Sequence, residues 1–210
     1  MHKRLMLAIV CSAVISISAF GVDLPTSNYS LTLAQNRTNW TGEEGDDLSI
    51  TIRTFGVEYG NAPIEGLGFV WSGTFLFPLS LSYNIGGELV TYDMTGFGFG
   101  MMFQLGAGYA IDLTERVRVM PGLGWNFTLS FFPHDFPGGA TSYQEVTHGP
   151  ALVGEVAYKL FDVFWLRAGA TLAYEGFQSA SQSNVTDTYR GGFVFRAAIG
   201  VRAPRIRRIL

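Results

Sequence analysis

The residue types best suited to catalysis lie close together in one stretch of the chain. His134 and Asp135 are adjacent, and Ser142 and His148 follow them. A histidine base, a serine nucleophile and an acid can catalyse hydrolysis when they come within hydrogen-bonding reach of one another. Spacing along a long loop does not provide that reach, and histidines in loops are usually solvated. We therefore expect no catalytic residues and a protein that is not an enzyme.

A second cluster with possible chemistry is the acidic run Glu43, Glu44, Asp46 and Asp47. Clustered carboxylates can bind calcium, but this spacing does not match the EF-hand loop. We expect a solvated acidic loop, with no metal site and no cofactor.

The remaining charged residues follow a regular pattern. In RVRVMPGLGWNFTLSFF, residues 116–132, the odd-numbered positions from 117 to 131 carry Val, Pro, Leu, Trp and Phe, and the even-numbered positions carry Arg, Met, Gly, Asn, Thr and Ser. A period of two indicates a β-strand, because successive side chains of a strand point to opposite faces. The segment therefore predicts a strand with one apolar face and one polar face.

The same alternation recurs and predicts eight strands, over residues 28–38, 48–60, 65–77, 95–111, 116–132, 149–160, 163–178 and 190–202. The first is the weakest pattern. The second changes phase after Ile52, which predicts a β-bulge near Arg53. Pro121 interrupts the fifth strand, either as a bulge with Gly122 or because regular pairing begins only at Leu123.

The connections between these segments alternate in length. Short connections are predicted at 60–64, 112–114 and 161–162, and long ones at 39–47, 78–93, 132–147 and 179–188. Eight antiparallel strands with short turns at one end and long loops at the other are typical of an up-and-down transmembrane β-barrel. A soluble barrel of the lipocalin type would carry its apolar residues inside and its polar residues outside, which is the reverse of this pattern.

The N-terminus predicts export. Lys3 and Arg4 precede an apolar run from Leu5 to Ile17, which is too short for a spanning helix and is typical of a secretory signal peptide. Cleavage after Gly21 is favoured, with Ser18 as the competing position. Residues 1–21 are then the signal peptide and 22–210 one barrel domain. That domain has no cysteine, so it forms no disulfide, and it has 12 basic against 17 acidic residues, so we expect no nucleic-acid partner.

The inward face of the predicted barrel collects the charges. The predicted lumen charges are Glu58, Arg116, Arg118, Glu155, Lys159, Arg167, Glu175, Arg196 and Arg202. An unpaired charge in a narrow interior is costly, so we expect ion pairs. Counting from the turn at 161–163 places Glu155 opposite Gly169 and diagonal to Arg167. A salt-bridged plug and a charged filter are both consistent with such a set.

Apolar residues also fall on the inward face, namely Val70, Leu76, Met102, Val153 and Val194. They lie between the middle and the long-loop end of the predicted strands. An apolar pocket above the charges and simple interior packing are equally good interpretations.

The stretch GFGFGMMFQLGAGYAIDLTERVRVMPGLGWNF joins a glycine-aromatic strand, a short turn and a second alternating strand. It resembles the small eight-stranded outer-membrane proteins of the OmpW and OmpA-barrel type, and the resemblance covers essentially the whole mature chain. It implies a monomeric bacterial outer-membrane barrel in contact with membrane lipid. The ending RAPRIRRIL departs from such proteins, which usually finish on an aromatic residue.

The two branches of this resemblance imply different functions. An OmpW-like barrel would give narrow passage or binding for small hydrophobic or ionic solutes, and this is the leading hypothesis. The alternative is a structural or adhesive surface protein with a plugged barrel, whose extracellular loops contact host ligands.

Overall fold

The computed structural model describes residues 26–41, 47–85, 87–92, 98–133, 142–161, 164–181 and 188–204. The predicted signal peptide and the C-terminal six residues lie outside these ranges. Among the described residues, no helix is long and apolar enough to span a membrane. The regular elements are all β-strands.

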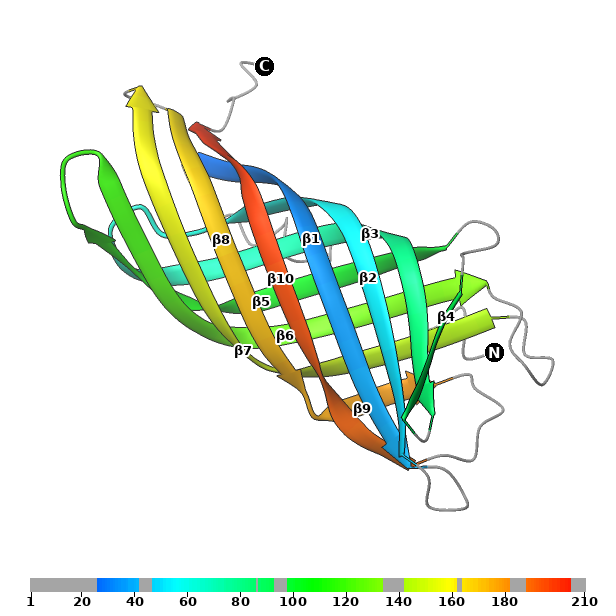
Figure 1. The fold of residues 1–210 in the computed structure, drawn as a ribbon. Coiled ribbons are helices and arrows are strands. Elements are labelled where there is room, and N and C mark those ends of the chain that lie inside the picture. Colours follow the sequence, from blue (N-terminus) through cyan, green and yellow to red (C-terminus); the bar gives the residue numbers. More distant parts are fainter. Residues whose placement is uncertain are drawn as a thin grey trace, which may run out of the picture.

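Eight long strands form the barrel (Figure 1). They are β1 Thr26–Thr41, β2 Asp47–Asn61, β3 Gly66–Ile85, β5 Phe99–Asp112, β6 Val117–Pro133, β7 Ser142–Phe161, β8 Phe164–Glu175 and β10 Thr188–Pro204. Two short strands, β4 Glu88–Tyr92 and β9 Phe177–Ser181, extend the sheet beside β3 and β7. Each long strand pairs antiparallel with the next, and β1 pairs with β10 to close the ring. The predicted eight-stranded up-and-down barrel is confirmed.

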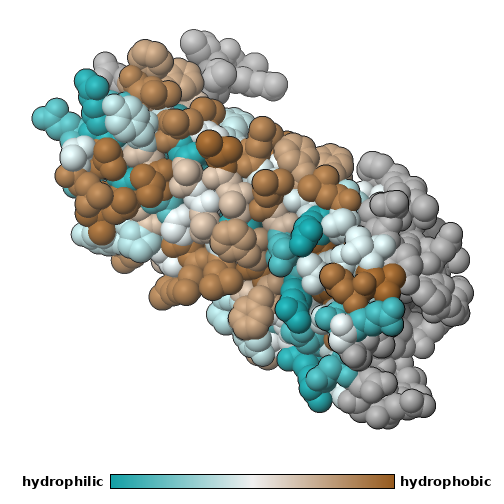
Figure 2. Space-filling view, in the orientation of Figure 1, coloured by the Kyte–Doolittle hydropathy of each residue, from teal (hydrophilic) through white to brown (hydrophobic). Residues whose placement is uncertain are grey.

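The barrel has two distinct ends. At one end, called the turn end, lie the connections 62–65 and 113–116, together with the paired residues Thr26 and Pro204. The opposite end, called the loop end, holds β4, β9 and the start of β7 (Figure 1). The odd and even positions of the strands separate between the exterior and the lumen: Leu31 is 54% exposed whereas Thr32 is 1% exposed. Figure 2 shows the resulting apolar exterior around the middle of the barrel.

The weakest predicted strand, 28–38, is a full strand that continues to Thr41. It is held on both sides, since β1 pairs with β2 from Asn28 to Thr41 and with β10 from Thr26 to Thr41. Its hydropathy pattern was weak because Gln35 and Arg37 occupy outward positions that are apolar elsewhere in the barrel. Backbone pairing with both neighbouring strands holds β1 in the extended conformation, whatever its hydropathy pattern.

The predicted bulge near Arg53 is in the neighbouring strand. β2 alternates without interruption, and its register with β1 is continuous. The register between β2 and β3 shifts beside Arg53, and the extra residue is Leu79 of β3. Ile50 and Ile52 simply face inward, because the lumen is apolar at their level. The change of phase in the hydropathy of β2 therefore comes from the change from a polar to an apolar lumen along the strand, and not from a bulge in β2.

Neither prediction for Pro121 is correct. β6 keeps one register with β7 from Val117 onward, and Pro121 lies opposite Gly154. On the β5 side the ladder is interrupted only between Gly122 and Val119, and the register is the same above and below this gap. A proline cannot donate a ladder hydrogen bond, so the strand accommodates it as a local gap on one edge.

The strands extend further at the loop end than predicted. Much of the predicted loop 78–93 is a hairpin of β3 and β4, and β7 begins at Ser142 within the predicted loop 132–147. The outward residues there include Ser82 and Asn84, whose polarity resembles that of a loop. Backbone pairing continues beyond the apolar exterior, where Leu81 and Tyr83 still alternate with Ser82 and Asn84, but the apolar residues face the lumen.

Candidate functional site

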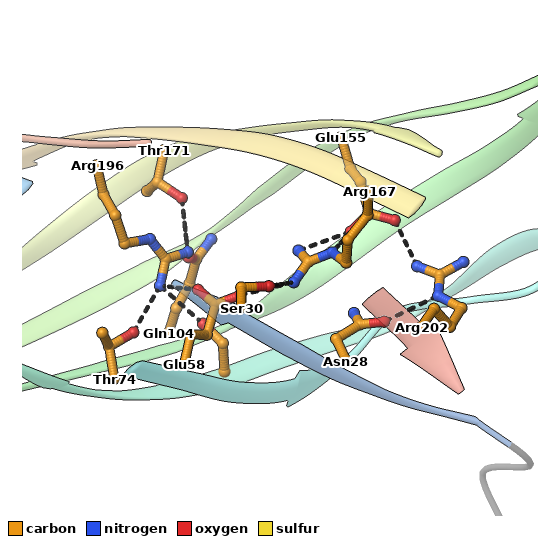
Figure 3. Close-up of polar contacts among 11 residues, drawn as sticks. Asn28, Ser30, Glu58, Thr74, Gln104, Glu155, Arg167, Thr171, Arg196 and Arg202 are labelled. Atoms are coloured by element: carbon orange, nitrogen blue, oxygen red, sulfur yellow. Dashed lines mark hydrogen bonds and ion pairs between the residues drawn. The ribbon is translucent and has the colours of Figure 1, made fainter. Parts of the chain in front are cut away.

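The lumen is crossed by a network of buried ion pairs centred on Arg167 of β8 (Figure 3). Its guanidinium reaches Glu58 of β2, with Nη1 2.8 Å from Oε1, and Glu155 of β7, with Nη2 2.8 Å from Oε2. It also donates to the Ser30 hydroxyl of β1 at 2.6 Å. The register that supports this contact, with Glu155 opposite Gly169, matches the one counted from the sequence. Arg167 therefore ties four strands together across the interior.

Arg196 of β10 extends the network toward the loop end. Its Nη1 lies 2.5 Å from Oε2 of Glu58, so this carboxylate lies between two arginines. The other acceptors around the Arg196 guanidinium are neutral: Ser72 and Thr74 of β3, Gln104 of β5 and Thr171 of β8. The side chain is buried, and its neutral partners spread its charge over three more strands.

Arg202 of β10 extends the network toward the turn end. Its Nη2 lies 2.5 Å from Oε1 of Glu155, and its Nε donates to Asn28 of β1 at 2.9 Å. The chain of contacts thus runs Arg196–Glu58–Arg167–Glu155–Arg202. Three arginines face two glutamates, so these five side chains carry one excess positive charge when all are ionised.

The space left beside this network is small. A cavity of about 20 Å³ is lined by Glu58, Glu155, Arg167 and Arg196, by polar neighbours that include Ser72, Gln104 and Thr171, and by apolar side chains that include Val70 and Met120. That volume accommodates about one water molecule and no larger solute. At this level the interior is filled by side chains, as expected for eight strands.

The turn end holds a further ion pair, and here the predicted lumen position of one residue, Arg116, is wrong. Arg118 is bidentate on Asp112, with distances of 2.6 and 3.1 Å, and lies 4.6 Å from the Trp165 ring centre. Arg116, predicted to face the lumen, is exposed in the turn 113–116. Its N–H donates to the Thr114 hydroxyl in a local turn that precedes β6, so the alternation of the strand does not reach it. Lys159 is half-buried on the inward face of β7.

Above the charges lies a layer of apolar side chains. Its buried members are Ala34, Leu76, Met102, Ala151, Ala173 and Val194. Two more of the predicted lumen residues, Val70 and Val153, lie lower and pack with Met120 and Ala62. All five predicted apolar lumen residues therefore face inward, where they pack against one another in two groups.

A second buried polar site lies beyond the apolar layer. Glu175 of β8 is fully buried and accepts hydrogen bonds from Asn126 at 2.8 Å and from the Thr128 and Thr147 hydroxyls. Tyr189 donates to the Glu175 carbonyl oxygen at 2.6 Å. Within the described part of the chain, no arginine or lysine contacts the Glu175 carboxyl. This site differs from the network in having only neutral partners.

The loop end of the lumen is closed by a third apolar group. Trp40, Ile50, Ile52, Leu81 and Tyr83 form a buried cluster with Leu48 and Tyr189 packed against it. The Trp40 and Tyr189 rings meet edge to face at 5.1 Å. Trp40, Leu81 and Tyr83 lie in segments predicted as loops, whereas Ile50 and Ile52 lie in the predicted strand 48–60.

The candidate catalytic residues do not assemble among the described residues. Ser142 and His148 lie on the same strand, β7, six residues or about 20 Å apart. His148 points outward and stacks on Phe177 at 5.4 Å, while the Trp125 indole donates to its Nδ1 at 3.3 Å. His134, Asp135 and the acidic residues Glu43, Glu44 and Asp46 lie outside the described residues, and the described Asp47 pairs with Arg190.

The neutral partners of the network were not singled out from the sequence. Ser72, Thr74, Gln104 and Thr171 occupy polar inward positions, so the alternation placed them in the lumen but did not indicate that they contact Arg196. Asn28 and Ser30 lie on the weakest predicted strand. Glu145, which is also buried, lies in a segment predicted as a loop. A search for polar residues on the inward phase of every strand would have found all of these except Glu145.

The exterior of the barrel is apolar over its central part. Aromatic side chains near the turn end, namely Tyr59, Tyr109, Tyr158 and Phe164, are exposed. Phe77, Tyr174 and Phe193 are exposed nearer the loop end. An apolar band between two aromatic zones, on a closed barrel, is the exterior of a transmembrane barrel.

Solved structures of outer-membrane proteins are similar to this one. AlkL, an outer-membrane protein solved in lipid bilayers, matches with a TM-score of 0.54 and 13% identity over 88% of this chain and 92% of that chain. Neisserial surface protein A gives 0.48 and 16% over 83% and 96%. Ail, the attachment invasion locus protein of Yersinia pestis, gives 0.41 and 15% over 85% and 98%. No protein-family model and no curated sequence matches the chain.

The chain has the fold of a small bacterial outer-membrane β-barrel. The identities are low, so the similarity shows the fold alone, and the apolar exterior of the closed ring is that of a barrel that spans an outer membrane. In such barrels the short turns and both termini face the periplasm and the long loops face outward. The turn end of this barrel, with Arg118 and Arg202, is therefore periplasmic, and the Trp40 cluster lies at the extracellular end.

Proposed function

We propose that this protein is a closed outer-membrane barrel that presents its loop end at the cell surface and does not conduct solutes. Of the two functions considered from the sequence, the geometry favours the plugged barrel with active loops. The observation that carries the proposal is the continuous chain of ion pairs from Arg196 to Arg202, which occupies the lumen.

The layers above the network support the same function. The Leu76 and Met102 layer and the Trp40 cluster fill the lumen on the extracellular side of the charges. Opening a passage would require several buried arginine–carboxylate pairs to separate, and breaking even one such pair by removing a partner costs about 3–5 kcal/mol. A rigid scaffold suits the display of the hairpins that extend beyond the apolar exterior.

Conductance in planar bilayers tests the closed lumen. We expect folded wild-type barrel to be silent in high salt, because its interior holds no continuous aqueous path. A porin that forms open channels, reconstituted in the same bilayers, serves as the positive control, and we expect discrete openings from it. Discrete openings of the wild-type protein would contradict the proposal.

Surface presentation is tested with cells. The segments 42–46, 93–97, 134–141 and 182–187 would be replaced by short glycine-containing turns, and folding checked by the heat-dependent shift of the barrel on gels. Cells carrying the wild-type protein are expected to attach to host-cell monolayers more than cells carrying the short-loop variant. Equal attachment by both, and by cells lacking the protein, would remove the adhesive function.

A further inference from the structure

Two arginines project from the outside of the barrel near its loop end. Arg37 of β1 and Arg53 of β2 are exposed and occupy outward positions, while the neighbours of Arg37, Asn36 and Thr38, face the lumen. Arg37 lies opposite Thr51, and Arg53 lies opposite Gln35. The two arginines are therefore diagonal neighbours on adjacent antiparallel strands, about 7–8 Å apart at their backbones, which long side chains can span.

The arginines stand at the edge of the apolar exterior. Next to them toward the turn end come Leu33 and Phe55, both exposed, and Phe193 lies beside Arg37 on β10. Figure 2 shows a hydrophilic stripe at this level, over β10, β1 and β2, between the apolar middle of the barrel and its loop end. In the outer membrane, this is the level at which the hydrocarbon of the outer leaflet gives way to its headgroups.

The charge of this pair is not balanced by the rest of the described chain. The Arg53 Nε donates to the neutral Gln35 amide oxygen at 3.4 Å, and among the described residues no carboxylate contacts Arg37 or Arg53. Arg190, the other exposed arginine near this end, does have such a partner, since its Nη1 lies 2.9 Å from Asp47. A charge beside hydrocarbon is costly unless an anion meets it.

We propose that Arg37 and Arg53 together bind a phosphate group of an outer-leaflet lipid. The guanidinium presents paired N–H donors that match two phosphate oxygens, and two guanidinium groups can converge on one phosphate. The aliphatic stems of both side chains can lie on the apolar exterior while their charged ends reach the headgroup level. Gln35 positions the Arg53 guanidinium by accepting the hydrogen bond from its Nε. The proposal requires only the outer-membrane location and not the closed lumen.

The test uses barrel purified from outer membranes and exchanged into phosphatidylcholine nanodiscs. The discs contain a small fraction of either phosphorylated lipid A or lipid A treated with phosphatase, and the lipid A that remains bound is measured by mass spectrometry. We expect the wild-type barrel to retain the phosphorylated form about tenfold better or more, because charge-assisted hydrogen bonds are lost with the phosphates. Arg37→Gln/Arg53→Gln should lose that preference, and the matched control Arg190→Gln should keep it.

The remaining outcomes also decide the question. Equal retention of both lipids by the wild-type barrel, or an unchanged preference in the folded double variant, overturns the proposal. Displacement of lipid A by millimolar inorganic phosphate would identify the site as one for free anions, which also overturns it. If the glutamine variant does not fold, Arg37→Lys/Arg53→Lys replaces it. The lysine variant is expected to keep only a partial preference, since an ammonium cannot make the bidentate contact.

Discussion

The lumen contains two buried carboxyl sites that are stabilised in different ways. Glu58 lies between two arginines, with its two oxygens 2.8 and 2.5 Å from their nitrogens. Glu175 lies further toward the loop end and is contacted by an amide and two hydroxyl groups. The same residue type is therefore held by charge in one region and by neutral hydrogen bonds in the other. A buried carboxyl does not need a cation if enough donors surround it.

The two regions also differ in their balance of charge. The network near the turn end has one more arginine than glutamate, whereas the upper region has the buried acids Glu145 and Glu175. An excess of positive charge on one side of the apolar layer thus faces acidic groups on the other. The apolar residues Leu76 and Met102 keep the two regions distinct.

The largest expected effect comes from Glu58→Gln. The substitution keeps the shape of the side chain but leaves Arg167 and Arg196 facing one carboxylate fewer in a buried site. We expect the free energy of unfolding to fall by about 3–5 kcal/mol. Urea unfolding in lipid vesicles, followed by tryptophan fluorescence, measures it. A loss as small as that of Glu175→Gln would erase the distinction between the two regions.

Arg202→Met is expected to have an intermediate effect. It removes one pairing of Glu155, but Arg167 still holds that carboxylate, and the network becomes neutral with two arginines and two glutamates. The main loss is the hydrogen bond to Asn28, so we expect a decrease of about 1–3 kcal/mol. The same urea titration measures the free energy of unfolding of this variant. A decrease equal to that of Glu58→Gln would show that the charge balance of the network is unimportant.

Glu175→Gln should be nearly neutral. The new amide can donate to the Thr147 hydroxyl, which rotates to accept, while its oxygen keeps the bond from Asn126. We expect a change of about 1 kcal/mol or less. This is the matched control for Glu58→Gln, because both variants exchange one carboxylate for one amide. A loss of several kcal/mol here would mean that the upper site needs the charge.

The smallest effect is expected for Arg190→Gln. Arg190 and Asp47 are both largely exposed at the loop end, and their ion pair contributes about 0.5 kcal/mol or less. We expect the difference in unfolding free energy between the wild-type protein and Arg190→Gln to vanish in high salt. The effect of Glu58→Gln should persist, because salt screens the buried network poorly. Unfolding at low and high salt, compared between the two variants, separates the exposed pair from the buried network.

The alternation of side chains was enough to predict most of the barrel. In β8, outward apolar residues alternate with inward polar ones. The outward set includes Phe164, Leu166 and Leu172, and the inward set includes Arg167 and Thr171. Only a strand with two different faces produces this pattern. The register of Glu155 against Gly169 could be counted because the connection between β7 and β8 is short. Where strands run past the apolar exterior, as at Ser82 and Asn84, the apolar side chains face the lumen and the polar ones face outward, and the hairpins were missed.

Two local irregularities depended on neighbouring strands. Nothing in the sequence of β2 indicates that Leu79 of β3 is the extra residue beside Arg53, since a bulge belongs to a pair of strands. The gap beside Pro121 likewise lies on the β5 edge and leaves the β7 edge intact. A single segment carries no information about which of its two edges tolerates a missing donor.

The sequence by itself determined the fold class, the inward and outward faces, and the identity of most charges in the lumen, because strand periodicity is a local property. Only the tertiary structure decided that Arg167 joins Glu58 to Glu155, that Glu175 has neutral partners, and that Arg116 lies outside the lumen. The contacts of Arg167 with Glu58 and of Glu175 with Asn126 and Thr128 join strands that do not follow one another in the chain. They depend on how the closed ring staggers its strands, which no local pattern specifies.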